Sequence, residues 1–235
     1  MWVSADYEAT TLFTLKPALA TSSGGKTLLV PTPYSIKMAL LDVGCQLEGV
    51  ETAKAFWKVL ANATVALRPA AEVVVNNTFT KVLRPRRNEA EAGEQHAGFF
   101  GKTIAYREYA YLEGKFGIAL EVGKTDDAER IARWLININY LGKRGGFIQL
   151  QALPTVSDSL PDRYIAVTGD LTGMGMESIL TQLDDTASDL SFERVNIYSK
   201  ETMMMGKHRL LKHVALPYRR VGSSRSYTHY KRSEE

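Results

Sequence analysis

The chain has 235 residues, of which 45% are hydrophobic, and a formal net charge of +3. This composition is typical of a globular protein with enough apolar residues for one large domain or two small ones. No apolar run reaches the roughly 18 residues of a membrane span, and Met1 to Asp6 lacks the pattern of a secretory signal, so we expect a cytoplasmic protein without membrane contact. Cys45 is the only cysteine, which excludes an internal disulfide and a cysteine-cluster metal site.

The first 47 residues predict a strand followed by a helix. Trp2 to Leu15 is rich in Thr, Val, Tyr and Phe, which favours a strand. Tyr34 to Leu47 carries apolar residues at helical spacing, and Thr32 and Pro33 before it suit an N-cap and a first turn.

A second helix and a second strand are expected next. Glu51 to Asn62 predicts a helix, with its core-facing side chains expected at Ala55, Phe56, Val59 and Leu60. Val65 to Val75 then predicts one continuous strand.

The central part of the chain begins with a long polar interruption of this pattern, Asn76 to Lys102. Ile104 to Leu112 and Phe116 to Val122 then predict a hairpin that turns at Glu113-Gly114. A helix over Asp126 to Asn137 and a strand over Ile148 to Leu153 complete the series, and the order of elements favours an α+β protein with an antiparallel sheet and helices on one face.

A glycine-rich loop, Leu141-Gly-Lys-Arg-Gly-Gly-Phe-Ile-Gln149, combines features that suit an RNA backbone. Its glycines, Gly145 and Gly146 among them, allow positive φ and a close approach of the main chain, so that N–H groups can point at phosphate oxygens. Lys143 and Arg144 supply positive charge, and Phe147 could stack on a base. The alternative is an ordinary hairpin turn with two solvated cations.

Two further segments are basic. The central interruption holds four cations, which are Lys81, Arg84, Arg86 and Arg87. Residues 217 to 235 hold five Lys or Arg against two Glu, interleaved with Tyr218, Tyr227 and Tyr230. Tails of this composition occur in proteins that bind single-stranded nucleic acids, and the alternative is a disordered, solubilising end.

Several motif lookalikes do not predict a cofactor or a metal. Gly-Lys-Thr occurs three times, but a phosphate-binding loop needs a glycine five positions earlier, where the chain has Ala20, His96 and Ile118. His208 and His213 are five positions apart, a spacing that does not place both rings on one helix face. We therefore expect neither a bound cofactor nor a metal.

The order of three segments resembles the RAMP-type subunits of CRISPR effector complexes, and specifically the Cas-five family. The first segment is Phe13-Thr-Leu-Lys-Pro17 leading to Pro31-Thr-Pro-Tyr-Ser-Ile-Lys-Met-Ala-Leu-Leu41, the second is Tyr106-Arg-Glu-Tyr-Ala-Tyr-Leu112, and the third is the glycine-rich loop. The resemblance covers roughly residues 2 to 151.

The resemblance implies a ferredoxin-like fold, a modified RNA-recognition-type sheet, with a projecting β-hairpin or thumb at about Asn77 to Thr103. Residues 1 to 151 would form this domain, and residues 152 to 235 a C-terminal extension that contains β-structure. It also implies a non-catalytic subunit of a type I Cascade complex, which caps the five-prime handle of the guide RNA, the crRNA. The partners would be the backbone and large subunits, with target DNA reached indirectly through base pairing. The residues expected to bind RNA are Lys81, Arg84, Arg86, Arg87, Lys143, Arg144, Gly145, Gly146 and Phe147.

Two alternatives remain open. Some members of the family cleave precursor crRNA without a metal, which needs a base and an acid beside the scissile phosphate. The candidates for such a site are His96, Lys102 and Tyr106. The other alternative is a structural assembly subunit without RNA contact of its own.

Overall fold

The computed structural model describes residues 1–20, 24–86, 88, 93, 99–142, 145–168 and 177–233. Four of the predicted site residues, Arg87, His96, Lys143 and Arg144, lie outside the described residues.

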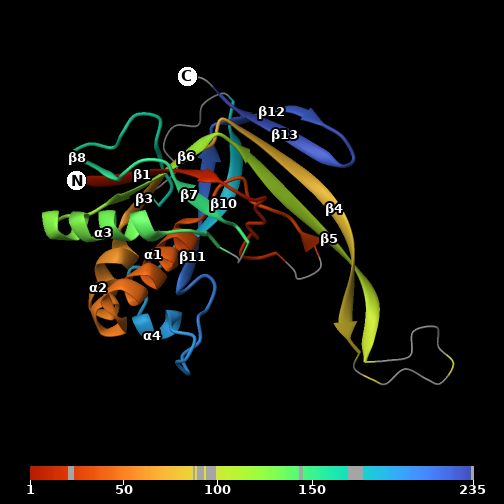
Figure 1. The fold of residues 1–235 in the computed structure, drawn as a ribbon, viewed down its shortest axis with the longest axis horizontal. Helices are drawn as coiled ribbons and strands as arrows, with labels where there is room; N and C mark the ends of the chain where they lie inside the picture. The colour runs from red at the N-terminus through yellow and green to blue at the C-terminus, as the bar shows by residue number, and fades with distance from the viewer. Residues whose placement is uncertain are drawn as a thin grey trace.

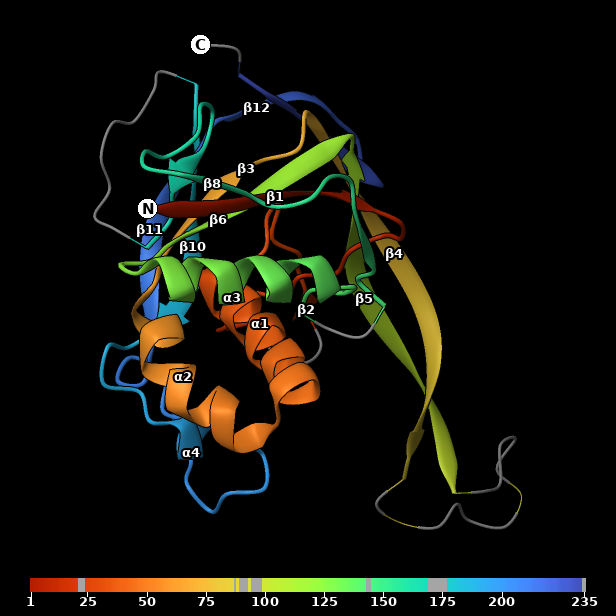
Figure 2. The same cartoon turned by 60° about the vertical axis from the view of Figure 1, so that its left-hand side comes forward.

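The first sheet has a ferredoxin-like core. Its four central strands run in the order β7-β1-β6-β3, and every neighbouring pair is antiparallel. These strands are β1 (Trp2–Ala9), β3 (Thr64–Arg68), β6 (Lys115–Glu121) and β7 (Ile148–Leu150). Helices α1 (Pro33–Glu48) and α2 (Val50–Asn62) connect β1 to β3, and α3 (Thr125–Asn137) connects β6 to β7. The predicted α+β class is confirmed, and the three helices cover one face of this sheet (Figure 2).

The first helix begins where the sequence predicts. The Thr32 side chain accepts a hydrogen bond from the Ser35 amide at 3.1 Å, and the Ser35 hydroxyl accepts one from the Thr32 amide at 3.0 Å, with Pro33 in the first turn. This reciprocal cap satisfies two backbone donors that a helix start leaves unpaired.

The buried face of α2 differs in part from the prediction. Phe56 and Leu60 are buried as expected, but Ala55 and Val59 are exposed. Trp57 is buried instead, and its indole N–H donates to the carbonyl of Leu190 at 2.6 Å. The C-terminal region therefore covers a side of α2 that the sequence pattern assigned to solvent.

A second sheet carries the projecting hairpin. Its strand order is β12-β13-β4-β5-β2, in which only the short contact of β2 with β5 is parallel. The strands are β2 (Gly24–Gly25), β4 (Glu72–Pro85), β5 (Phe100–Glu113), β12 (Tyr218–Ser223) and β13 (Tyr227–Arg232). Strands β4 and β5 pair continuously from Glu72 and Glu113 to Pro85 and Phe100, and their far half extends well beyond the body of the protein (Figure 1).

Two predictions about these strands are wrong. The single strand expected over Val65 to Val75 is two strands, β3 and β4, which belong to different sheets. Strand β3 ends before Pro69, and β4 begins at Glu72. The hairpin expected around Gly114 does not form either, since β5 pairs with β4 and β6 pairs with β1 and β3. Gly114, at φ +75°, instead turns the chain from the second sheet into the first.

The C-terminal region adds strands to both sheets and builds a third. Strands β8 (Thr155–Ser157) and β9 (Ile165–Ala166) pair with β1 and β3. Strands β10 (Ile179–Thr186) and β11 (Arg209–Leu216) form a separate antiparallel pair, with the short helix α4 (Phe192–Val195) between them in the chain. The basic tail is not a disordered end, because β12 and β13 form a hairpin that pairs with β4.

Neither a membrane helix nor a metal cluster occurs in the described part of the chain. The helices there lack the length and apolar content that a membrane crossing requires. The described His, Cys, Asp and Glu side chains also form no group of three or more that could hold a metal ion. His208 is buried, with its Nδ1 accepting a hydrogen bond from the Met204 amide, whereas His213 lies beside Gln182.

Candidate nucleic-acid interface

The three sequence segments that carry the family resemblance meet at one place in the fold. Phe13 and Ala110 form an antiparallel bridge, with distances of 2.8 and 2.7 Å between the amide nitrogens and the carbonyl oxygens. The Thr10 amide donates to the carbonyl of Phe147 at 3.0 Å, and the Thr11 hydroxyl accepts from the Phe147 amide at 3.0 Å. The segment after β1 therefore lies between β5 and the glycine-rich loop.

The glycines of that loop are required by its backbone. Gly142 and Gly145 have φ values of +71° and +103°, which residues other than glycine rarely adopt. The Leu141 amide donates to the carbonyl of Gly146 at 3.0 Å. A Cβ on Gly146 would stand 2.8 Å from the Leu141 oxygen and 3.1 Å from the Phe13 ring. Phe147 is exposed, as stacking on a base would require.

A cavity of about 340 Å³ lies against this loop. Gly145 and Gly146 line one side of it, the segment from Leu12 to Thr14 lines another, and Arg107 and Tyr109 of β5 line a third. A cation and an aromatic ring thus lie beside the two glycines, of which Gly145 is exposed and Gly146 is buried.

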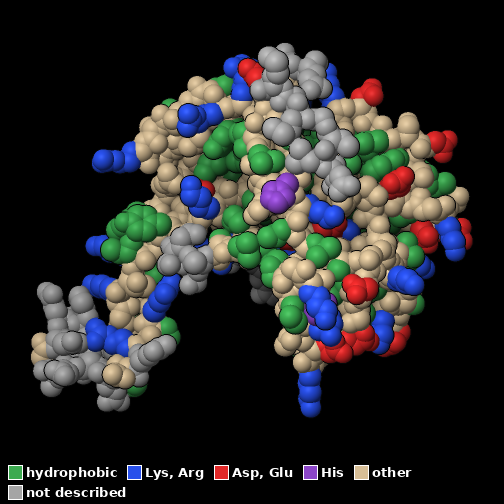
Figure 3. Space-filling view, turned by 180° about the vertical axis from the view of Figure 1, so that it is seen from behind, with side chains coloured by type: hydrophobic (Ala, Val, Ile, Leu, Met, Phe, Trp, Pro, Cys, Tyr) green, Lys and Arg blue, Asp and Glu red, His purple; other side chains and the backbone are tan. Residues whose placement is uncertain are grey.

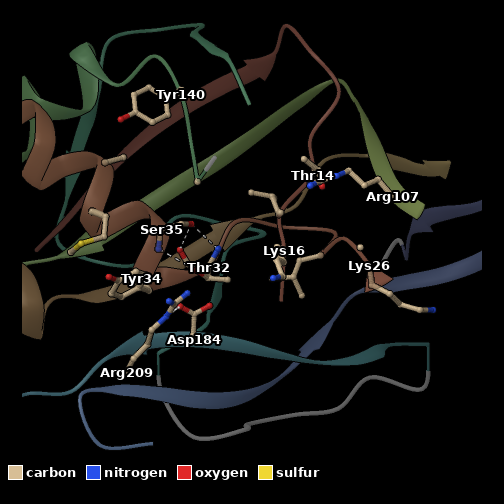
Figure 4. A pocket seen from close by; sticks show the side chains of 16 residues that line it. Thr14, Lys16, Lys26, Thr32, Tyr34, Ser35, Arg107, Tyr140, Asp184 and Arg209 are labelled. Carbon is tan, nitrogen blue, oxygen red and sulfur yellow. Dashed lines mark hydrogen bonds and ion pairs between the residues drawn. The ribbon is translucent and has the colours of Figure 1, made fainter. Parts of the chain in front are cut away.

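A second cavity of about 550 Å³ adjoins the first and shares Thr14 and Arg107 with it. Four cationic side chains line it, which are Lys16, Lys26, Arg107 and Arg209 (Figure 4). Asp184 is the acidic residue in its lining, and its carboxylate lies 2.5 Å from Arg209 Nε. The Arg209 guanidinium also lies 4.1 Å from the centre of the Tyr34 ring, so both partners hold it in place.

The parallel contact of β2 with β5 brings two of these cations together. Gly25 pairs with Arg107, and a Cβ on Gly25 would stand only 2.9 Å from the carbonyl oxygen of Tyr106. Lys26 follows directly and lies 3.8 Å from Glu108. The absence of a side chain at Gly25 therefore allows the two segments to approach closely.

The projecting hairpin places the predicted cations on different faces. Lys81 is exposed on the face that continues the buried side of β4, whereas Arg84 is exposed on the opposite face. Gly101 pairs with Arg84, and a Cβ there would lie 3.3 Å from the Arg86 side chain. The hairpin cations that the structure describes, Lys81, Arg84 and Arg86, therefore do not form a single patch.

The hairpin also carries an apolar stripe that the sequence pattern did not predict. Five exposed hydrophobic side chains share one face through their register, namely Phe79, Leu83, Phe100, Ile104 and Tyr106. Nearer the body, the same face is the one that Val73 and Val75 bury in the core. Figure 3 shows hydrophobic and cationic side chains together along the hairpin, which stands clear of the body.

The two described candidates for a ribonuclease site do not converge. Lys102 and Tyr106 lie on one face of β5, but four residues along a strand separate them by about 13 Å. The Tyr106 ring packs edge-on against Phe79, with 5.1 Å between the ring centres. A base and an acid must both reach one phosphate, and this pair does not supply that geometry.

Comparisons with known proteins give structural matches only. No protein-family model matches the chain, and no curated protein does. A CRISPR protein from Archaeoglobus fulgidus matches with 14% identity and a TM-score of 0.39, over 99% of this chain and 92% of that one. A chain from a CRISPR RNA-guided surveillance complex matches with 15% identity and a TM-score of 0.49, over 92% and 90%. A Cas protein matches with 15% identity and a TM-score of 0.37, over 92% and 94%.

All three are CRISPR-associated proteins. The identities of 14–15% and the TM-scores below 0.5 do not assign this chain to a family, so membership of the Cas-five family stays a prediction. Within the part of the chain that the structure describes, sequence reading missed Lys16, Lys26, Arg107 and Arg209 as site residues. Lys16 and Arg107 lie inside the segments that carry the resemblance, but their convergence depends on the pairing of distant strands.

Proposed function

We propose that this protein is a non-catalytic RNA-binding subunit of a CRISPR effector complex, and that it caps the five-prime handle of the crRNA. The observation that carries the proposal is the pair of adjoining cavities beside the glycine-rich loop, which share Arg107. All three segments that resemble the Cas-five family contribute residues to the lining of these cavities.

The charge of the site suits a phosphate backbone. The larger cavity has four cations, and the one carboxylate in its lining is paired with one of them, Arg209. Lys26 also lies near a carboxylate, that of Glu108 at 3.8 Å, so the positive excess of the lining comes chiefly from Lys16 and Arg107. Each phosphate neutralised there would release condensed counterions and add affinity that falls with salt concentration.

The projecting hairpin supports a place within a larger assembly. Its apolar stripe, from Phe79 to Phe100 on the paired strands, is exposed in the isolated chain. Exposed apolar surface of this extent marks a contact with another macromolecule. We propose the backbone and large subunits of the effector complex as its partners, with target DNA reached through base pairing to the guide.

Binding of a labelled CRISPR repeat RNA to the purified chain tests this proposal, with affinity measured as a function of salt. We expect salt-sensitive binding to intact RNA. An Arg107→Gln/Lys16→Gln variant should bind more weakly and with a shallower dependence on salt, because two phosphate contacts are removed. Lys54→Gln is the matched control, since Lys54 is a cation of α2 outside both cavities, paired with Glu193.

A variant that binds as tightly as the wild type would contradict the proposed site. Metal-independent cleavage of the same RNA on a denaturing gel would support the ribonuclease alternative instead. Assembly of the chain with the other subunits, without contact to crRNA, would support the purely structural alternative.

A further inference from the structure

The second sheet has an inner and an outer face of different character. Residues that pair across neighbouring antiparallel strands lie on the same face. Val73, its β13 partner Tyr230 and its β5 partner Leu112 lie on the inner face, where Val73 and Leu112 are buried and Tyr230 packs against the core. The residues that alternate with these lie on the outer face.

Four aromatic rings lie on the outer face, two from each of the strands that flank β4, and they are Tyr109, Tyr111, Tyr227 and His229. Val74 pairs with both His229 and Tyr111, and Asn76 pairs with both Tyr227 and Tyr109. The rings therefore stand in two rows, about 7 Å apart along the strands and about 10 Å apart across them. Tyr111 and Tyr227 are 46% and 39% exposed, so their rings are open to a ligand.

Neighbouring groups hold two of these rings. The Tyr111 hydroxyl donates to the Glu113 carboxylate, which raises the pKa of Tyr111. The His229 Nε2 lies 2.7 Å from the Glu72 carboxylate, which also lies 3.9 Å from Lys231 Nζ. The Glu113 and Glu72 carboxylates thus contact Tyr111 and His229, and Lys231 offsets the charge of Glu72.

The outer face is continuous with the smaller cavity beside the glycine-rich loop. Tyr109 belongs to both, and Arg107, the next outward-facing residue on β5, lines both cavities. Figure 1 shows β13 alongside the root of β4, and β5 pairs with the other edge of β4.

From this geometry we propose that the outer face of the second sheet, defined by Tyr109, Tyr111, Tyr227 and His229, is a stacking platform for the bases of single-stranded RNA. The RNA would leave the cationic cavities at Arg107 and pass over the sheet. Aromatic rings on neighbouring strands of an open sheet stack two or three bases in this way, with little dependence on sequence. The inference rests on the proposed RNA-binding function and assigns a role to the C-terminal hairpin.

The test uses the full chain and a fluorescent, unstructured 16-nucleotide RNA, with affinity measured by anisotropy at two salt concentrations. Tyr111→Leu/Tyr227→Leu should weaken binding about tenfold or more, by the same factor at both salt concentrations, because stacking does not release counterions. With an abasic RNA of the same length, the double variant and the wild type should bind with equal affinity. Tyr198→Leu is the control, since Tyr198 is 91% exposed and lies outside the second sheet.

The outcomes separate this inference from the proposed function. Unchanged affinity in the double variant, with weaker binding by Arg107→Gln, would overturn the platform and leave the cavity site standing. An equal loss on RNA without bases would also overturn it, because the change would then act through the fold. Failure of the wild-type chain to bind any RNA at low salt would overturn both. Photocrosslinking of 5-iodouridine RNA to peptides that contain Tyr111 or Tyr227 would support the platform directly.

Discussion

Lys37 Nζ of α1 lies 2.7 Å from the Asp185 carboxylate of β10, in an interior where the two side chains are only 1% and 6% exposed. The ammonium also donates to the carbonyl of Ala61 and to the Thr186 hydroxyl, at 2.9 and 3.0 Å. Burial lowers the pKa of Lys37, while Asp185 acts in the opposite direction. This pair fixes the C-terminal strand pair to the helical layer of the ferredoxin-like core.

Removal of one charge from this pair should destabilise the protein strongly. Asp185→Asn leaves a buried ammonium without its counter-ion, so we expect the free energy of unfolding to fall by about 3 kcal/mol or more. Urea denaturation measures this change. Lys37→Met/Asp185→Leu should lose less stability than Asp185→Asn, because no charge remains buried. Lys54→Gln should change stability little, because the ion pair of Lys54 with Glu193 is exposed. Equal effects of Asp185→Asn and Lys54→Gln would contradict the account.

Gly146→Ala should distort the glycine-rich loop. The new methyl group would meet the Leu141 oxygen at 2.8 Å and the Phe13 ring at 3.1 Å, so the loop or the ring must move. We expect a loss of about 1–3 kcal/mol in urea denaturation, together with weaker RNA binding. The control is Gly123→Ala, because nothing lies within 4 Å of a Cβ at Gly123. Identical stability of the two variants would show that the loop accommodates a side chain.

Arg209→Gln should damage the larger cavity in two ways. Asp184, whose side chain is almost completely buried, would lose its charged partner, at a cost of about 2 kcal/mol in the free energy of unfolding. The cavity would also lose one cation, so RNA affinity should fall. Adding Asp184→Asn to this variant should restore stability, since the unpaired carboxylate is gone. If the double variant is no more stable than Arg209→Gln, the ion pair is not the cause of the loss.

Stability should fall in alkali as the buried tyrosines begin to ionise. Tyr218 is almost completely buried, its hydroxyl donates to the carbonyl of Ala70 at 2.8 Å, and burial raises its pKa above the ordinary value of 10.0. Above pH 10 the unfolded chain therefore loses this proton first, and each such group lowers stability by up to about 1.4 kcal/mol per pH unit.

Urea denaturation between pH 8 and pH 11 tests this directly. Tyr218→Phe should be less stable at pH 8, because it lacks the hydrogen bond, but should lose less stability between pH 10 and pH 11. Parallel pH profiles for the variant and the wild type would mean that Tyr218 ionises equally in both states.

Local patterns in the sequence determined much of the fold. The helix start at Thr32 and Pro33 was predicted correctly, because a reciprocal cap uses residues only three positions apart. The glycine-rich loop was recognisable for the same reason, since positive φ at Gly142 and Gly145 is a local demand. The α+β class also followed from the order of the elements along the chain.

The pairing of strands was decided only by the tertiary structure. The alternation of apolar and polar residues predicts that β5 and β6 are strands, but it does not encode which strand each one pairs with. The predicted hairpin at Gly114 was therefore wrong. The exposure of Ala55 and Val59 escaped prediction because the C-terminal region covers the other side of α2.

The candidate site divides along the same line. The sequence by itself marked the glycine-rich loop and the tyrosines of the tail as residues suited to nucleic acid. It did not show that Tyr218 and Tyr230 face the core while Tyr227 joins Tyr109 on an open sheet face. The grouping of Arg107 with Arg209 depends on contacts between segments about 100 residues apart, and such contacts are set by packing rather than by local sequence.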